Sequence, residues 1–173
     1  MTDEEKDLIN DCRIMIVGTG DFISYLMTEL SVIGFDRIQK VTSPLTMPGT
    51  EGILIEYIGS GSSLAVVGDE IPMIYPFDFI KGAGVIVVFP GDDRGFLNED
   101  NVRLWAAEYM SGYSAFWNMD GYDWLREVLP EIRAHMTSDE AQKLAAHLCA
   151  RIAANIAVGR KVKRFPRFYL VES

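Results

Sequence analysis

The sequence predicts a three-layer α/β fold with a mainly parallel sheet. Residues 14–17 and 85–89 form continuous apolar runs, which are typical of strands buried on both faces of a sheet. Segments with helical periodicity alternate with such runs, as in folds built from β-α-β units. A glycine turn, Gly18-Thr19-Gly20, joins the first run to the first long helical segment. The 173 residues can bury a sizeable core, so we expect one domain spanning residues 1–173.

The N-terminal part predicts a helix followed by one β-α-β unit. Residues 2–11 have helical character and are strongly acidic, which favours a short solvated helix. Residues 22–33 carry apolar side chains at helical spacing, and Gly34 follows as a helix-ending glycine. Residues 37–41 predict the second strand, and the unit has the length of about 30 residues that this motif requires.

The middle of the chain predicts a β-hairpin insertion. Residues 53–58 and 64–67 are rich in β-forming side chains, and the glycines and serines of 59–63 between them are typical of a turn. The apolar strand 85–89 then leads into a polar loop at 90–95.

The remaining elements complete a Rossmann-like domain. They are an extended piece at 73–75, helices at about 99–110, 121–134 and 138–158, and strands at 114–118 and 168–171. Ser138 supplies cap chemistry at the start of the last helix. Ligands of such sheets lie at the carboxyl ends of the parallel strands. We therefore expect Gly18, Gly20 and the loop 90–95 on one edge.

Composition and charge exclude several functions. Apolar residues make up 49% and charged residues 24%, as in ordinary globular proteins. The net charge of −9 argues against nucleic-acid or anionic-membrane binding, because both surfaces are negative. The acidic start lacks signal-peptide features, and no apolar run approaches the roughly 20 residues of a membrane span. Cys12 and Cys149 are too few for a disulfide framework or a zinc site, so we expect a reducing cytoplasm.

The glycine turn has the features of a nucleotide-binding loop. Gly18 permits a tight turn out of the strand, and Gly20 lets a phosphate approach the backbone. The helix that begins near Asp21 offers N–H groups and the positive end of its dipole. Further candidate binding residues in this stretch are Thr19 and Ser24. The alternative is a plain strand-to-helix turn.

The end of the second predicted strand lacks the acid of an NAD-dependent dehydrogenase. Thr42 and Ser43 stand where Asp or Glu would hold the ribose hydroxyls. Ile23 also replaces the third glycine of the G-x-G-x-x-G pattern. These differences leave NADP or an adenine nucleotide as expected ligands, with Thr42 among the binding residues.

The stretch GTGDFISYLMTELSVIGFDRIQKVTSP resembles the nucleotide loop of ThiF/MoeB-type and ubiquitin-activating-type proteins. Their loop reads G-x-G-G-x-G-S, followed by a helix that ends in G-V-x-x-I. The matching residues are Gly18, Gly20, Ser24, Gly34 and Ile38, while Asp21 and Ile23 replace two glycines of the pattern. The run VIVVFPGDDRGFLNEDNVRLWAAEYMSG is similar, more loosely, to the family's later strand, acidic turn and Asn-containing helix.

The resemblance implies binding of ATP and Mg²⁺. Asp92 or Asp93 would correspond to the acid that works with both. The implied reaction is the ATP-dependent adenylylation of a small-molecule or peptide carboxylate in a biosynthetic pathway. From the residues alone, Asp92 and Asp93 can equally form an ordinary solvated turn.

Two other functions remain open. An NAD(P)-binding oxidoreductase would keep the glycine loop. A non-catalytic interaction module with a decayed site would fit the altered glycines and the lack of any Lys or Arg between Val41 and Ile80.

Three further groups of residues stand out. Aromatic side chains gather in 105–124, where they can form core, line a pocket or build a homodimer interface; we expect a homodimer. Residues 160–167 carry five cations in eight positions. These cations can bind a phosphate or an acidic partner, or they can simply form a solvated segment near a helix C-terminus. The spacing of His135, His147 and Cys149 does not predict a metal site.

Overall fold

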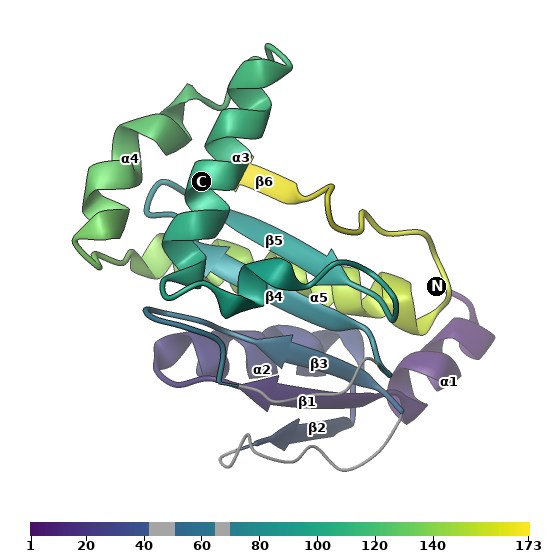
Figure 1. Cartoon of the computed structure of the whole chain (residues 1–173). Coiled ribbons are helices and arrows are strands. Elements are labelled where there is room, and N and C mark those ends of the chain that lie inside the picture. The colour runs from purple at the N-terminus through teal and green to yellow at the C-terminus, as the bar shows by residue number, and fades with distance from the viewer. Residues whose placement is uncertain (42–50, 65–69) are drawn as a thin grey trace.

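One six-stranded sheet lies between two layers of helices in the residues that this computed structural model describes, 1–41, 51–64 and 70–173 (Figure 1). Along the chain the elements are α1 (Asp3–Asp11), β1 (Arg13–Val17), α2 (Asp21–Ile33), β2 (Arg37–Lys40), β3 (Ile53–Glu56), β4 (Met73–Asp78), β5 (Gly82–Val88), the 3-10 helix η1 (Gly95–Asn98), α3 (Val102–Phe116), α4 (Asp123–Arg133), α5 (Asp139–Ala157) and β6 (Tyr169–Glu172). This architecture confirms the predicted three-layer, Rossmann-like α/β fold.

The strand order is β2-β1-β3-β4-β5-β6. Strands β2, β1, β3 and β4 are parallel, whereas β5 is antiparallel to β4 and β6 is antiparallel to β5. The chain leaves β1 toward β2 on one side and returns to β3 on the other side. The carboxyl ends of β1 and β3 therefore form a topological switch point, where open α/β sheets bind ligands.

Each face of the sheet buries its own apolar cluster. Helices α1, α2 and α5 cover one face, where Ile14, Ile16 and Ile74 point. Helices α3 and α4 cover the other face, over Met15, Leu54 and Ile86. Because both faces are covered, β4 and β5 are buried along their whole length, as the continuous apolar run at 85–89 predicts for β5.

Several helix ends follow the predicted local chemistry. Gly34 ends α2 with a φ of 123°, and its N–H donates to the Leu30 carbonyl at 3.2 Å. Ser138 begins α5, and its hydroxyl accepts the Ala141 N–H at 3.3 Å.

The predicted hairpin at 53–58 and 64–67 is wrong. Strand β3 is flanked by β1 and β4, both parallel to it, so neither side is available to a hairpin partner. Residues 65–67 of that prediction lie outside the described residues. The hairpin is instead β4–β5, because the three residues 79–81 between them are too few for a parallel crossover. Its turn places Ile80 at a φ of 67°.

The direction of β5 also corrects the expected position of the loop 90–95. Because β5 is antiparallel to β4, its carboxyl end lies at the amino-terminal edge of the parallel strands. Loop 90–95 is therefore on the edge opposite Gly18 and Gly20. The expectation that they share one edge is wrong.

The strand predicted at 114–118 is wrong as well. Helix α3 continues to Phe116, and the Ser114 hydroxyl donates to the Met110 carbonyl one turn earlier, at 2.8 Å. Phe116 and Trp117 favour a strand there, but packing of α3 on the sheet overrides this local preference.

Candidate functional site

Two glycine-containing turns meet at the carboxyl ends of β1 and β3. A Cβ at Gly18 would lie 3.1 Å from both the Cβ and the carbonyl oxygen of Tyr57, so glycine allows the turns to approach closely. The Tyr57 N–H donates to the Val17 carbonyl at 2.9 Å. Gly20 differs, because a Cβ there would meet no heavy atom within 4 Å. Gly18 shapes the turn, whereas Gly20 leaves space beside the N-terminus of α2.

Two adjoining cavities open at this turn. The serine-side cavity, of about 360 Å³, lies beside β3 and the α4–α5 connection, and its lining includes Tyr57, Ser60, Ser62, His135 and Thr137. The helix-side cavity, of about 430 Å³, lies beside α2 and β2, and its lining includes Gly20, Ile23, Ser24, Lys40 and Val41. Both are lined by Val17, Gly18, Thr19 and Leu64. An elongated ligand that crosses the glycine turn can therefore occupy both cavities.

Tyr57 forms a fixed wall of the serine-side cavity. Its ring stacks on Phe22 with 4.3 Å between the centroids and 13° between the planes. Burial, followed by the negative charge of Asp78, raises the pKa of Tyr57 to about 12. Tyr57 thus keeps its phenolic proton at neutral pH and can donate it in a hydrogen bond.

The buried carboxylate of Glu56 folds the segment after β3. It accepts the Ser63 hydroxyl at 2.6 Å and the Leu64 N–H at 2.7 Å. These bonds return residues 57–64 over the end of β3, which places Ser60 and Ser62 in the cavity lining. The segment predicted as a hairpin turn is therefore part of the candidate site.

The α4–α5 connection closes the serine-side cavity with an unusual residue. The His135 N–H donates to the Ile132 carbonyl and the Met136 N–H to the Glu131 carbonyl, both at 3.0 Å. This pair of bonds defines a Schellman motif, whose left-handed position is usually glycine. His135 occupies that position, with a φ of 61°. Its imidazole is exposed and has no hydrogen-bond partner among the described residues.

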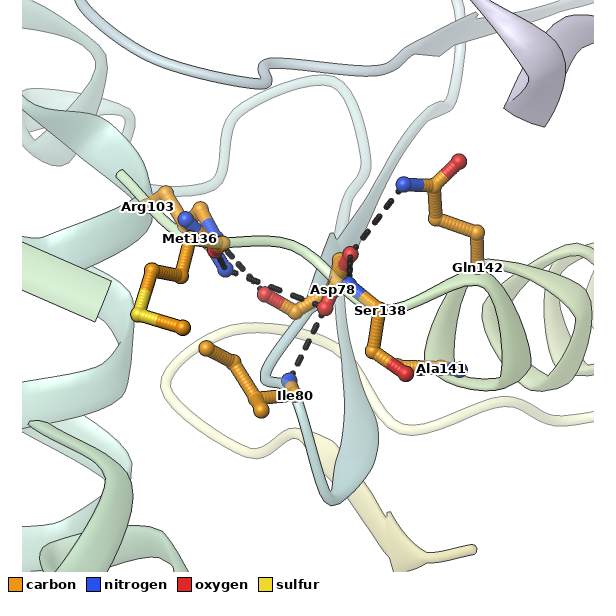
Figure 2. Close-up of polar contacts among 7 residues, drawn as sticks. All are labelled: Asp78, Ile80, Arg103, Met136, Ser138, Ala141 and Gln142. Carbon is orange, nitrogen blue, oxygen red and sulfur yellow. Dashed lines mark hydrogen bonds and ion pairs between the residues drawn. The ribbon is translucent and has the colours of Figure 1, made fainter. Parts of the chain in front are cut away.

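A buried pair, Asp78 and Arg103, fixes this connection to the sheet (Figure 2). The Asp78 side chain is 0% exposed and that of Arg103 is 2% exposed, and Arg103 Nη2 lies 3.7 Å from Asp78 Oδ1. Arg103 Nη2 donates to the Met136 carbonyl at 2.6 Å, and Asp78 Oδ2 accepts the Ser138 N–H at 2.8 Å. Thr137 is thus held from both sides.

The same carboxylate also fixes the turn after β4. Asp78 Oδ1 accepts the Ile80 N–H at 2.8 Å, and Oδ2 accepts Gln142 Nε2 at 3.2 Å. Arg103 Nε donates to the Asp78 carbonyl at 2.6 Å. Burial lowers the pKa of Arg103, and the charge of Asp78 opposes this shift. Satisfied partners on every side make the pair a rigid joint between β4, α3 and α5.

The structure brings together four of the residues predicted for the nucleotide site. Gly18, Thr19, Gly20 and Ser24 all line the helix-side cavity. Lys40, at the end of β2, adds a cation to that cavity. Thr42 lies outside the described residues.

Asp92 and Asp93 are placed far from that group, on the opposite edge of the sheet. Asp92 accepts two hydrogen bonds from Arg164, at 2.7 and 2.9 Å, and one from the Phe89 N–H at 2.9 Å. Asp93 accepts the Gly95 N–H at 2.8 Å. Each acid accepts a backbone N–H of its own turn. Because they lie on the opposite edge, neither can hold an Mg²⁺ ion that also contacts a ligand at Gly20.

The basic tail, residues 160–167, lies on that opposite edge too. Arg160 pairs with Glu5 of α1, and the Phe165 N–H donates to the Val87 carbonyl at 2.8 Å. The tail therefore does not supply cations to the glycine turn, contrary to one of its expected roles.

The aromatic residues of 105–124 divide between core and surface. Trp124 is buried, and Trp105 stacks on Tyr109 with 5.1 Å between the centroids. Phe116 and Trp117, at the end of α3, are 76% and 61% exposed. Core packing accounts for the first group only.

The described residues form neither a metal-binding cluster nor a membrane-spanning helix. No group of three or more His, Cys, Asp or Glu residues among them is arranged to hold a metal ion. None of the helices in that part of the chain is long and apolar enough to span a membrane.

Sequence reasoning missed several residues of the site. The sequence predicts a hairpin for Tyr57, Ser60 and Ser62, because strand direction cannot be read from an apolar run. The sequence does contain one signal for His135. The helix predicted at 121–134 is followed by no glycine, so a histidine has to take the helix-ending position.

The chain matches no protein-family model, and no curated protein matches it significantly.

Proposed function

We propose that this chain binds a nucleotide at the switch point between β1 and β3. The observation that carries the proposal is the open space above Gly20, at the N-terminus of α2, in the helix-side cavity. The first N–H groups of a helix attract phosphate through hydrogen bonds and the helix dipole. Gly20 lets phosphate approach them closely, and Lys40 adds positive charge nearby.

The activity proposed for this site is adenylylation of a carboxylate, in keeping with the ThiF/MoeB resemblance. A carboxylate oxygen would attack the α-phosphorus of ATP, the bond between the α-phosphorus and its bridging oxygen would break, and pyrophosphate would leave. Here the glycine turn would orient the phosphates for this attack. No step is assigned to Asp92 or Asp93, because they lie on the opposite edge.

Calorimetric titration with ATP tests nucleotide binding, with Gly20→Val as the diagnostic variant. We expect wild type to bind ATP and the folded variant to lose binding, because the valine side chain occupies the open space above α2. Equal affinity of the two proteins would show that phosphate is not held there. Pyrophosphate exchange with a panel of carboxylates tests the reaction itself; ATP binding without any exchange would reject adenylylation alone.

NADP is the second candidate ligand, favoured by Lys40. This cation lines the cavity at the end of β2, where an acid would select NAD and a cation accommodates the 2′-phosphate of NADP. Titration with NADPH and NADH separates the candidates. Preference for NADPH that disappears in Lys40→Ala, with no binding of ATP, would establish the oxidoreductase-type ligand.

A non-catalytic module is the remaining candidate. A ligand that binds the native state must raise the melting temperature. A nucleotide panel that leaves the melting temperature unchanged, at millimolar concentrations, would favour this function over the first two.

The proposed assembly is a homodimer in the reducing cytoplasm, where the free thiols Cys12 and Cys149 stay reduced. The exposed pair Phe116 and Trp117, with ring centroids 5.1 Å apart, supports an interface at the end of α3. Aromatic side chains are enriched at the centres of interfaces. Light scattering after gel filtration measures the mass, and a monomer at high concentration would reject the dimer.

A further inference from the structure

His135 occupies a position that is unfavourable for a histidine. It is the left-handed residue of the Schellman motif that ends α4, with a φ of 61°. Glycine takes this conformation without steric cost, whereas other residues lose stability there. Side chains held in such conformations cluster at binding and catalytic sites. Stability therefore does not explain why a histidine occupies this left-handed position.

The serine-side cavity offers a functional explanation for the histidine. His135 lines the serine-side cavity, and its imidazole makes no hydrogen bond within the described chain. The same cavity is also lined by Thr19, Ser60 and Tyr57, all with hydroxyl groups. A ligand group in this cavity would therefore have hydroxyl donors and the imidazole of His135 within its lining.

The orientation of the ligand follows from the sheet. In Rossmann-type sheets the ribose lies at the end of the second strand and the first phosphates lie at the glycine turn. The nucleoside therefore belongs in the helix-side cavity, beside Lys40, and the far phosphates point across Gly18 toward the serine-side cavity. The cavities adjoin at Gly18 and Thr19, which makes this path continuous.

We propose that His135 binds the distal phosphates of the nucleotide, and that Asp78 and Arg103 are positioning residues for it. This inference rests on the proposed nucleotide function. Arg103 holds the Met136 carbonyl and Asp78 holds the Ser138 N–H, so the residues directly after His135 are fixed to β4 and α3 (Figure 2). The joint keeps the imidazole over the cavity.

His135→Gly is the diagnostic variant, because binding and stability should change in opposite directions. We expect its melting temperature to rise by about 2 °C as the backbone strain is relieved. Its affinity for ATP should fall by about tenfold, as expected when a hydrogen bond to a charged group is lost. Its affinity for AMP, which lacks the distal phosphates, should not change.

Asn118→Gly is the matched control. Asn118 has a φ of 50° in a second Schellman motif, at the end of α3, where the Met119 N–H donates to the Ser114 carbonyl at 2.9 Å. It does not line either cavity at the glycine turn. We expect a small rise in melting temperature and no change in ATP affinity.

A double-mutant cycle tests the positioning role. Arg103→Met should weaken ATP binding in the wild-type background and have little effect in the His135→Gly background, because the joint acts through the imidazole. Arg103→Lys is the milder alternative if Arg103→Met does not fold. Additive losses would assign Arg103 a general structural role and reject positioning.

The outcomes separate this inference from the proposed function. If wild type binds neither ATP nor AMP, the nucleotide function fails and the inference fails with it. If wild type binds ATP and His135→Gly binds it equally well, only the inference is overturned. An equal loss for AMP and ATP would place His135 at the nucleoside end and contradict the assigned orientation.

Discussion

At the residue scale, Gly18 and Gly20 have different surroundings. Both have positive φ values, 147° and 91°, but only Gly18 is crowded by Tyr57. Gly20 borders open space. A sequence pattern of two glycines cannot separate a packing requirement from a binding requirement. The contacts show a packing requirement at Gly18 and none at Gly20, and they predict distinct phenotypes.

Gly18→Ala should destabilise the fold more than Gly20→Ala. At Gly18 the new methyl group would lie 3.1 Å from the Tyr57 carbonyl oxygen and 3.2 Å from Ile23 Cδ1, in addition to backbone strain. We expect a loss of about 2–3 kcal/mol in the free energy of unfolding at Gly18 and about 1 kcal/mol at Gly20. Urea denaturation measures both. Equal losses would contradict the assigned role of Gly18.

Tyr57 gives a prediction for the alkaline range. An unfolded tyrosine has a pKa of about 10, while burial raises that of Tyr57 to about 12. The raised pKa means that the stabilising contribution of the protonated phenol is complete below about pH 10. It is lost as the pH rises toward 12.

Tyr57→Phe should therefore show a shallower loss of stability between about pH 10 and 12 than wild type, by about 1–2 kcal/mol over that range. Tyr169→Phe is a control at a partly exposed tyrosine of β6. Denaturation at a series of pH values makes the comparison. Parallel curves for Tyr57→Phe and wild type would show that the Tyr57 phenol titrates normally.

At the element scale, the early β-α-β unit could be predicted well, and the region after it could not. The sequence correctly places α2, its closing Gly34 and both flanking strands, because apolar spacing and a helix-ending glycine are local. Strand direction is not local. The residues of β4 and β5 are fully buried and mostly apolar, and nothing in such a run distinguishes parallel from antiparallel pairing.

The turn between β4 and β5 shows why the hairpin was misplaced. Hairpin prediction relies on glycine or asparagine at positive φ, and the segment 59–63 is rich in glycine. The real turn uses Ile80 at positive φ, where Asp78 accepts its N–H and the neighbouring core packs its side chain. The carboxylate of Asp78, which is 0% exposed and is paired with Arg103, takes the place of the glycine or asparagine of a usual hairpin turn. The candidate site was partly mispredicted for the same reason, since Asp92 and Asp93 follow β5.

The C-terminal tail gives a prediction for the acid range. Hydrogen bonds from Arg164 lower the pKa of the Asp92 carboxyl, and the Phe89 N–H contributes in the same direction. A lowered pKa means that this stabilising contribution is present above about pH 4 and is lost as the pH falls further. The tail should therefore loosen from the loop 90–95 in acid.

Asp92→Asn should remove this acid dependence. Because Arg164 is 47% exposed, we expect the ion pair to contribute only about 0.5 kcal/mol at neutral pH. Hydrogen exchange at the Phe165 amide, which donates to Val87, reports on the tail. Asp93→Asn is the control, because Asp93 accepts the Gly95 N–H and is not paired with Arg164. The same acid dependence in wild type and Asp92→Asn would exclude this carboxylate as the cause.

At the scale of the whole molecule, the end of α3 combines exposed aromatic residues with two hollows of different charge. The basic hollow, of about 280 Å³, is lined by Trp117, Met119, Lys163 and Arg167 among others. The acidic hollow, of about 260 Å³, includes Asp120 and Asp123, together with Arg126 and again Met119. Because Met119 lines both hollows, we expect a twofold axis near it that places each basic hollow against the acidic hollow of a second copy. Such a self-complementary surface is what an isologous dimer requires.

Charge exchange tests this dimer. A variant with Lys163→Glu and Arg167→Glu should be monomeric, and so should one with Asp120→Lys and Asp123→Lys, because each places like charges opposite each other twice. Mixing the two variants should restore a dimer, since every contact again joins opposite charges. Light scattering and native mass spectrometry distinguish the mixed pair from each monomer. If wild type is dimeric and both variants remain so, the interface lies elsewhere on the molecule; if the mixture stays monomeric, the two hollows do not face each other.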